Sequence, residues 1–355
     1  MDILTSSDKQ TKPERTILFI IDGLPAGIEQ RIEMPNLLAL KYEGVSYEEV
    51  YLPLAGHPAY SETYPWTCTI PNPVLMSGTI FIGQEGLSEN LIQHSFTEKP
   101  TAFYTNSWTY EAISHGFTHY VDFSENKREN LFKDELPIEA AKQAIVIQNP
   151  EFIRVHCQGP GSAGHRSHRE SDQPYTGNIW AADSPFIQQN QYVDKLLGDF
   201  VDWLKTESLW DETVLFVMGD HGQCDTGGHG TYEPGGYTTQ LVIAGNHIRK
   251  GINYKYAEMI DIAPTIAWLH HVPAPKFSAG RVLQEITGEE VNSDPITPSM
   301  KLLDESLIEY NRLNQPVEGF LTIEEIGLWH TTPAKADYLS FVQQQVSLIN
   351  HSHII

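Results

Sequence analysis

The sequence predicts an α/β protein, an α/β/α sandwich built around a mostly parallel central sheet. Two continuous apolar runs, residues 16–21 and 214–218, are each followed closely by an aspartate. Amphipathic stretches with helical spacing lie between the predicted strands, and such alternation is typical of a parallel sheet covered on both faces. A composition with 40% hydrophobic and 10% aromatic residues is that of a globular protein.

The elements follow in chain order. The run TILFII reads as a buried strand that ends at Asp22-Gly23, and residues 35–44 have helical spacing with a glycine stop. Residues 45–68 carry three prolines and are expected to form a long ordered loop. The remaining predictions are strands at 152–155, 214–218 and 241–244, a helical stripe from 193 to 204, and a helix at 261–269.

Three regions are expected along the chain. Residues 1–15 form a polar tail, and residues 16–285 form the α/β core, with a variable substrate-facing insert around 95–150. Residues 286–355 form a C-terminal helical extension, in which Met300, Leu303 and Leu307 begin an amphipathic pattern.

Charge and composition restrict the partners. The chain has 46 acidic and 23 basic residues, a net charge of −23, which disfavours nucleic-acid and membrane-surface partners. An anionic substrate would need a local source of positive charge, and a bound metal is the usual one. Three cysteines and the lack of an apolar leader predict a cytoplasmic protein without disulfides. The expected partner is a small phosphorylated molecule; the sequence does not specify an oligomeric state.

One glycine-rich segment, residues 219–230, concentrates metal-ligating side chains. Asp220 and His221 are adjacent after a buried strand, and His229 follows between two glycines. Carboxylate and imidazole together suit zinc, manganese or iron. Taken alone, the segment fits a metal-binding loop and a glycine-rich turn with a capping aspartate equally well.

Together with other short motifs, this segment resembles the alkaline phosphatase superfamily, in particular its type I phosphodiesterase/nucleotide pyrophosphatase branch. The resemblance covers residues 16–95 and 150–285. The Gly-x-His-Gly form at 227–230 is similar to ethanolamine-phosphate transferases of the same superfamily. The other motifs are D-G at 22–23, P-N-L-x-x-L at 35–40, T-x-P-N at 69–72, G-L-x-x-N at 86–90, the G-H at 164–165, D-H-G at 220–222, I-A-P-T-I at 262–266 and G-R-x-L at 280–283.

The resemblance implies two adjacent metal sites, occupied by zinc, or else manganese or iron. Its first site matches in full, and its second matches at two histidines but has Gly161 where the family has an aspartate. Replacement ligands considered for the second site are Ser162, His168, Asp172, Cys157 and Cys224, and the alternative is an enzyme with a single metal. The implied metal ligands are Asp22, Thr69, Asp220 and His221 at the first site, and His165 and His229 at the second.

The implied activity is hydrolysis of a phosphodiester, pyrophosphate or phosphonate through a phospho-enzyme intermediate on Thr69. Asn72 would donate a hydrogen bond to a phosphoryl oxygen. A sulfatase-like reaction at Cys68 is weaker as a hypothesis, because the arginine of the sulfatase motif C-x-[PA]-x-R is absent after it. The motifs are also compatible with a phosphoryl- or phosphoalkyl-group transferase and with a catalytically silent relative.

Overall fold

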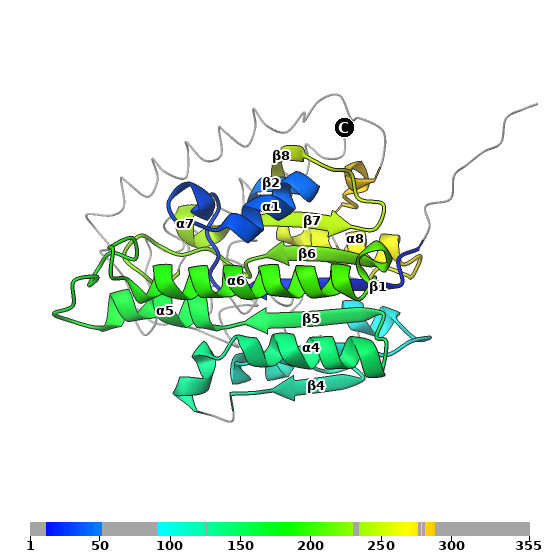
Figure 1. Ribbon diagram of the computed structural model, residues 1–355, viewed down its shortest axis with the longest axis horizontal. Helices are drawn as coiled ribbons and strands as arrows, with labels where there is room; N and C mark the ends of the chain where they lie inside the picture. Colours follow the sequence, from blue (N-terminus) through cyan, green and yellow to red (C-terminus); the bar gives the residue numbers. More distant parts are fainter. Residues whose placement is uncertain are drawn as a thin grey trace, which may run out of the picture.

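The computed structural model describes residues 12–51, 91–124, 127–229, 234–275, 278 and 281–287. These residues form an eight-stranded sheet with the order β4-β3-β5-β1-β6-β7-β2-β8 (Figure 1). The strands from β4 to β6 are parallel, whereas β7 runs antiparallel to both β6 and β2. The prediction of a mostly parallel sheet is therefore confirmed. The strands are β1 (Arg15–Ile21), β2 (Gly44–Tyr51), β3 (Thr101–Thr105), β4 (His119–Asp122), β5 (Phe152–Cys157), β6 (Thr213–Met218), β7 (Thr238–Gly245) and β8 (Ile252–Glu258).

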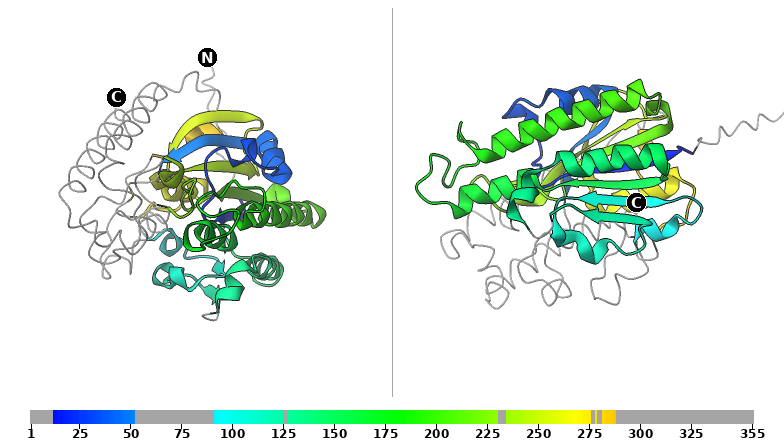
Figure 2. Two further views of the ribbon diagram at one scale, coloured as in Figure 1. Left: turned by 90° about the vertical axis from the view of Figure 1, so that its left-hand side faces the viewer. Right: turned by 60° about the horizontal axis from the view of Figure 1, so that its bottom comes forward.

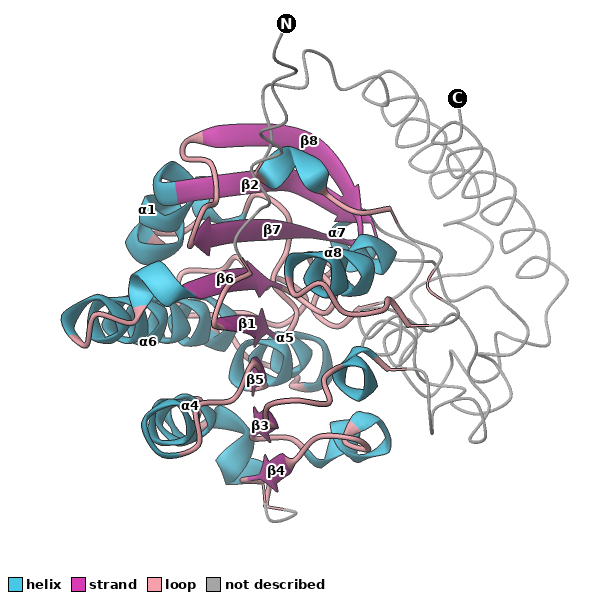
Figure 3. Cartoon of the chain, turned by 90° about the vertical axis from the view of Figure 1, so that its right-hand side faces the viewer, coloured by secondary structure: helices cyan, strands magenta, loops and turns pink. Residues whose placement is uncertain are grey.

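Helices cover both faces of the sheet, as the predicted sandwich requires. Figures 2 and 3 show α1 (Pro35–Glu43), α4 (Glu135–Ile147) and α6 (Pro185–Thr206) on one face and α8 (Ile262–Leu269) on the other. Helix α5 (Gly159–Arg169) follows β5, and α7 (Pro234–Tyr237) is a single turn before β7. Short 3-10 helices are η1 (Ile28–Gln30), η2 (Ile92–Ser95), η3 (Trp108–Ile113), η4 (Arg128–Phe132), η5 (Trp210–Glu212), η6 (Met259–Asp261) and η7 (Gln284–Ile286).

Strand β1 is buried on both faces, which explains its unbroken apolar sequence. Ile17, Phe19 and Ile21 pack in the cluster that includes α1, α4 and α6 side chains. Leu18 and Ile20 pack in the cluster on the α8 side. Fully burying a side chain of this size contributes roughly 1.5–3 kcal/mol, so the strand that ends at Asp22 is held firmly from both sides.

Two stretches differ from the expectations for them. Residues 45–51 were expected at the start of a loop, but together with Gly44 they form β2, with Val45, Tyr47 and Val50 buried. The pairing of β2 with β7 shifts register between Tyr47 and Val50, and this irregularity hides the strand in the sequence pattern. Residues 101–147, within the expected insert, supply β3, β4 and α4 of the sandwich. Residues 1–11, 52–90 and 288–355 lie outside the described residues.

A polar network connects the start of β1, the end remote from Asp22, to the residue that follows α8. Thr16 Oγ1 lies 2.8 Å from His270 Nε2, and His270 Nδ1 lies 3.1 Å from a Glu151 carboxylate oxygen. Burial raises the pKa of Glu151, but hydrogen bonds from His270 and Lys12 outweigh it and leave the pKa at about 2. Because Thr16 and His270 are buried, we interpret this network as structural.

Helix α1 is capped by a carboxylate from another helix. Met34, at its N-cap position, makes no capping hydrogen bond through its side chain. Asp194 of α6 instead accepts hydrogen bonds from the backbone N–H of Leu37 at 2.8 Å and of Asn36 at 3.1 Å. A buried carboxylate at a helix N-terminus satisfies free N–H groups and interacts favourably with the helix dipole.

Replacing Asp194 by Ala is therefore expected to lower the free energy of unfolding by about 2–4 kcal/mol, because buried donors lose a charged partner. Denaturant unfolding of the full chain measures the change. Asp199→Ala is the matched control: this aspartate lies on the same helix, is exposed and pairs with Lys195. The control is expected to change stability by no more than about 0.5 kcal/mol. Equal effects of the two substitutions would contradict the capping role.

No helix in the described part of the chain combines the length and apolarity needed to cross a bilayer.

Candidate metal centre

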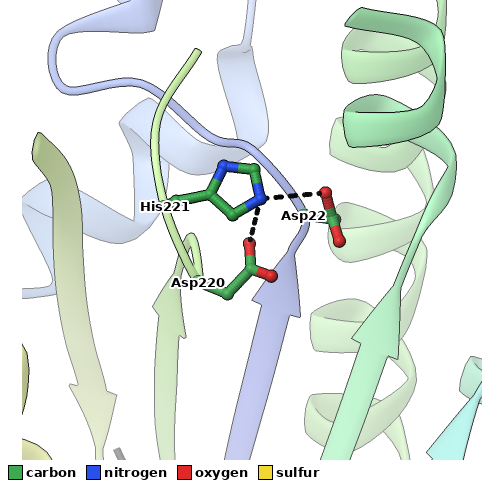
Figure 4. Close-up of side chains that lie close together, drawn as sticks. All are labelled: Asp22, Asp220 and His221. Carbon is green, nitrogen blue, oxygen red and sulfur yellow. Dashed lines mark ion pairs between the residues drawn. The ribbon is translucent and has the colours of Figure 1, made fainter. Parts of the chain in front are cut away.

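Three buried side chains converge at the carboxyl ends of two neighbouring strands. Asp22 follows β1 directly, and Asp220 and His221 follow β6. The two strands are parallel, with Ile20 paired to Met218, so both acids reach the same edge of the sheet. One ligand atom from each of the three residues lies within 4.8 Å of the other two, and Figure 4 shows the three side chains pointing toward one another.

The hydrogen bond of His221 determines which of its nitrogens faces the aspartates. Its Nδ1 lies 2.6 Å from the backbone carbonyl of Gly222, an acceptor, so Nδ1 must carry a proton. Its Nε2 lies 3.5 Å from Asp22 Oδ1 and 3.6 Å from Asp220 Oδ1. In the neutral ring, Nε2 then directs a lone pair at two carboxylate oxygens. Three atoms that can each offer a lone pair thus converge on one point, an arrangement that could hold a metal ion.

The closeness of the two buried carboxylates also favours a metal ion at this point. Burial and the neighbouring Asp220 raise the pKa of the Asp22 carboxyl well above its usual range. Two buried carboxylates so close together are costly, and a divalent cation offsets that cost. The donor set of two carboxylates and one imidazole suits a metal such as zinc. The residues of the first predicted site that the structure describes therefore fit a metal ion.

The opposite sides of the two carboxylates contact residues that the sequence analysis missed. The Tyr110 hydroxyl lies 2.9 Å from Asp22 Oδ2 and 2.8 Å from Asp220 Oδ2. His156 Nε2 lies 3.2 Å from Asp22 Oδ2. His156 has a detectable signal, since it and Arg154 are polar side chains two residues apart in an otherwise apolar strand. Tyr110, on η3, lies in a stretch without a motif.

The two histidines of the second predicted site lie next to the first. Gly227 and Gly228 adopt positive φ values of 96° and 76°, a tight turn that places His229 over His221 with ring centroids 4.0 Å apart. The His165 ring, from α5, lies 4.9 Å from the His229 ring. Burial lowers the pKa of both histidines, to about 3 for His165, so both are neutral and able to offer a lone pair.

The space for the missing second-site aspartate is occupied by Asp22. A Cβ built on Gly161 would lie 1.5 Å from Asp22 Oδ1 and 2.5 Å from its Cγ. Within the described residues, the first site is the only group of three or more His, Cys, Asp or Glu ligand atoms that lie this close together. His168, Asp172, Cys157 and Cys224 therefore do not complete the second site in this structure. The two histidines do not fit a metal ion by themselves.

The predicted nucleophile Thr69, its rival Cys68 and the predicted phosphoryl-binding Asn72 lie outside the described residues. Their roles, and the assignment of metal ligands, stay predictions.

Comparison with known proteins identifies the family. The sequence model of the Sulfatase family matches residues 29–272, well over half of the chain. The chain belongs to the Sulfatase family. Solved structures similar to it include members of the alkaline phosphatase superfamily, so membership of that superfamily, expected from the motifs, is confirmed. This metal-dependent superfamily holds hydrolases and transferases of phosphate and sulfate esters, and the Asp-Asp-His group agrees with its metal dependence.

Relatives of this Sulfatase-family chain by sequence include GPI ethanolamine phosphate transferases. The GPI ethanolamine phosphate transferase 2 of Candida albicans is 28% identical over 185 residues, which cover 48% of this chain and 20% of the relative. The GPI ethanolamine phosphate transferase 3 of Eremothecium gossypii is 22% identical over 243 residues, which cover 60% of this chain and 22% of the relative. The chain thus spans about a fifth of the length of these relatives.

Solved structures extend the likeness at the level of the fold. Murine ectonucleotide pyrophosphatase/phosphodiesterase 5 has a TM-score of 0.57 at 13% identity, covering 77% of this chain and 100% of that one. A phosphonate monoester hydrolase from Silicibacter pomeroyi has a TM-score of 0.54 at 14% identity, covering 79% and 78%. At these identities the likeness shows the α/β fold of the superfamily.

Proposed function

We propose that this protein is a metal-dependent transferase that moves a phosphoalkyl group, of the phosphoethanolamine class, from a phosphodiester donor to a hydroxyl acceptor. The observation that carries a metal-dependent reaction is the convergence of Asp22, Asp220 and His221 on one point. Transfer is favoured over hydrolysis by Gly161, because the second metal that would supply hydroxide lacks a ligand. The ethanolamine phosphate transferases among the sequence relatives support the same choice.

Each residue at the site has a role in this proposal. Asp22, Asp220 and His221 would hold one zinc or manganese ion, which supplies Lewis acidity at the Thr69 hydroxyl and the phosphoryl oxygens. Thr69 Oγ would attack phosphorus, forming a Thr69–phosphorus bond while the bond to the donor's alcohol breaks and that alcohol leaves with a proton. The acceptor oxygen would then bond to phosphorus as the Thr69 Oγ–phosphorus bond breaks, and the acceptor's proton would return to Thr69 Oγ.

The neutral pair His165 and His229 borders this centre and is suited to contact the substrate. Neutral imidazoles donate or accept single hydrogen bonds without adding charge. We propose that these two histidines orient the donor or the acceptor.

We further propose that the protein acts on small phosphorylated molecules in the cytoplasm, without nucleic-acid or membrane partners.

The test is a partition experiment. An aryl phosphodiester that carries an ethanolamine arm is incubated with the full chain and zinc or manganese, with and without small alcohols as acceptors. Absorbance follows release of the aryl alcohol, and ³¹P NMR shows whether the phosphoethanolamine group goes to the acceptor or to water. The proposal is supported if the alcohol receives a larger fraction of the phosphoethanolamine groups than its mole fraction relative to water. Free phosphoethanolamine alone would establish the hydrolase instead, and no release with any divalent metal would exclude both.

Thr69→Ala provides the matched variant in the same assay. Because it lacks the proposed nucleophile, it is expected to release less than about 1% of the aryl alcohol released by wild type. Full activity in this variant would rule out the covalent intermediate.

A further inference from the structure

The two aspartates of the metal centre each use their two oxygens for different tasks. Both Oδ1 atoms face His221 Nε2, and Asp220 Oδ1 also accepts the backbone N–H of Gly23 at 3.1 Å. Both Oδ2 atoms face away from His221 and toward the Tyr110 hydroxyl. The carboxylates are thus divided into a side that faces His221 and a side that faces Tyr110.

Tyr110 is held so that its hydroxyl reaches both Oδ2 atoms. Its side chain is buried, and its ring lies with its centroid 4.0 Å from that of His156. The guanidinium of the buried Arg154 lies 5.9 Å from the Tyr110 ring and 5.0 Å from that of Phe103. Burial and the two aspartates raise the pKa of the Tyr110 hydroxyl well above its usual range, so it stays protonated and serves as a donor.

His156 supports one of the same oxygens from the neighbouring strand. It lies on β5, which pairs in parallel with β1, and its Nε2–H donates to Asp22 Oδ2. Asp22 Oδ2 therefore lies within hydrogen-bond distance of two groups on different elements, His156 and the Tyr110 hydroxyl. The single proton of that hydroxyl is shared with Asp220 Oδ2.

We propose that Tyr110 is a positioning residue of the metal centre, and that it works with His156 to hold the Asp22 and Asp220 carboxylates in the orientation that binds the ion. This inference rests on the metal centre of the proposed function. Residues that orient ligating carboxylates determine affinity without touching the metal, and removing one typically weakens binding about 10–100-fold.

The experiment measures zinc affinity rather than turnover. Full-length wild type, Tyr110→Phe and Tyr120→Phe are titrated with zinc against a chromophoric chelator. Tyr120→Phe is the matched control, because it also removes a buried hydroxyl, one without a hydrogen-bond partner among the described residues. Tyr110→Phe is expected to raise the zinc Kd by about 10–100-fold, and Tyr120→Phe to leave it within about twofold.

Thermal unfolding without metal separates positioning from general support of the fold. If Tyr110 were merely structural, the variant would melt at a lower temperature while its zinc Kd stayed that of wild type, and the proposal would be overturned. A wild-type protein that binds no zinc would overturn the metal centre itself, and the positioning role with it. Wild-type binding with an unaffected Tyr110→Phe variant would overturn the positioning role alone.

A pair of substitutions at His156 decides the matter if Tyr110→Phe does not fold. His156→Gln can keep an N–H donor near Asp22 Oδ2 and is expected to retain most of the zinc affinity. His156→Leu removes the donor and is expected to weaken zinc binding by about tenfold. Equal affinities in the two variants would contradict the proposed role of these hydrogen bonds.

Discussion

Replacing Asp220 by Asn is expected to abolish metal binding and activity together, while leaving the metal-free fold about as stable as wild type. The substitution removes one of two anionic ligands, so zinc affinity is expected to fall more than about 100-fold and activity about 1000-fold. It also removes a buried negative charge beside Asp22, whose pKa is raised by burial and by Asp220. Relief of that repulsion offsets the loss of a carboxylate that accepts hydrogen bonds from Gly23 and Tyr110, so the metal-free unfolding temperature is expected to stay close to that of wild type.

Elemental mass spectrometry, activity assays and metal-free thermal unfolding check the three parts of this result. Asp225→Asn is the control, because it makes the same change in the same loop at an exposed residue that pairs with Arg31. It is expected to retain the metal content and activity of wild type. An Asp220→Asn variant that keeps full metal content would show that the converging acceptors do not hold the ion.

Gly161→Ala is expected to weaken metal binding about tenfold or more although it adds one methyl group. Wild type is expected to bind one zinc or manganese ion per chain. The new Cβ would lie 1.5 Å from Asp22 Oδ1 and 2.5 Å from its Cγ, so the carboxylate has to leave its present position. That movement breaks the hydrogen bonds of Asp22 with Tyr110 and His156. Metal titration of the full chain measures the effect.

Gly161→Asp makes the same steric change but supplies a carboxylate beside His165 and His229. It is expected to bind metal more tightly than Gly161→Ala, because three donors would then surround the second position. Comparison of the two variants separates loss of space from gain of a ligand. If the Asp variant binds metal no better than the Ala variant, the rings of His165 and His229 do not form the remainder of a second site.

The parts of the fold that were predicted are those whose sequence carries a local signal. Strands β1 and β6 are continuous apolar runs that end near an acid, and both were predicted within a residue or two. Strand β2 was missed because Glu48 and Glu49 interrupt the apolar pattern at the point where its register shifts. Strand β8 was missed although its apolar residues at 252, 254 and 256 alternate with polar ones, a pattern typical of a strand.

In the candidate site, too, the residues next to strong local sequence signals were predicted and the others were not. Asp22, Asp220 and His221 directly follow strands, and the parallel arrangement of β1 and β6 is enough to bring them together. Tyr110 reaches the site from a short 3-10 helix between β3 and the edge strand β4, and nothing in the residues around it indicates that position. The contact of Asp22 with Gly161 also depends on tertiary packing, since the sequence shows a missing ligand but not what occupies its place.

The position of β1 in the middle of the sheet has a consequence for biosynthesis. Its two neighbours are β5 and β6, which begin at Phe152 and Thr213. At translation rates of about 5–20 residues per second, β6 leaves the ribosome about 10–40 s after β1. During that interval the apolar strand that carries Asp22 has an unpaired edge, and metal binding cannot begin before residue 221 emerges. Metal capture would therefore report completion of the sheet on the nascent chain.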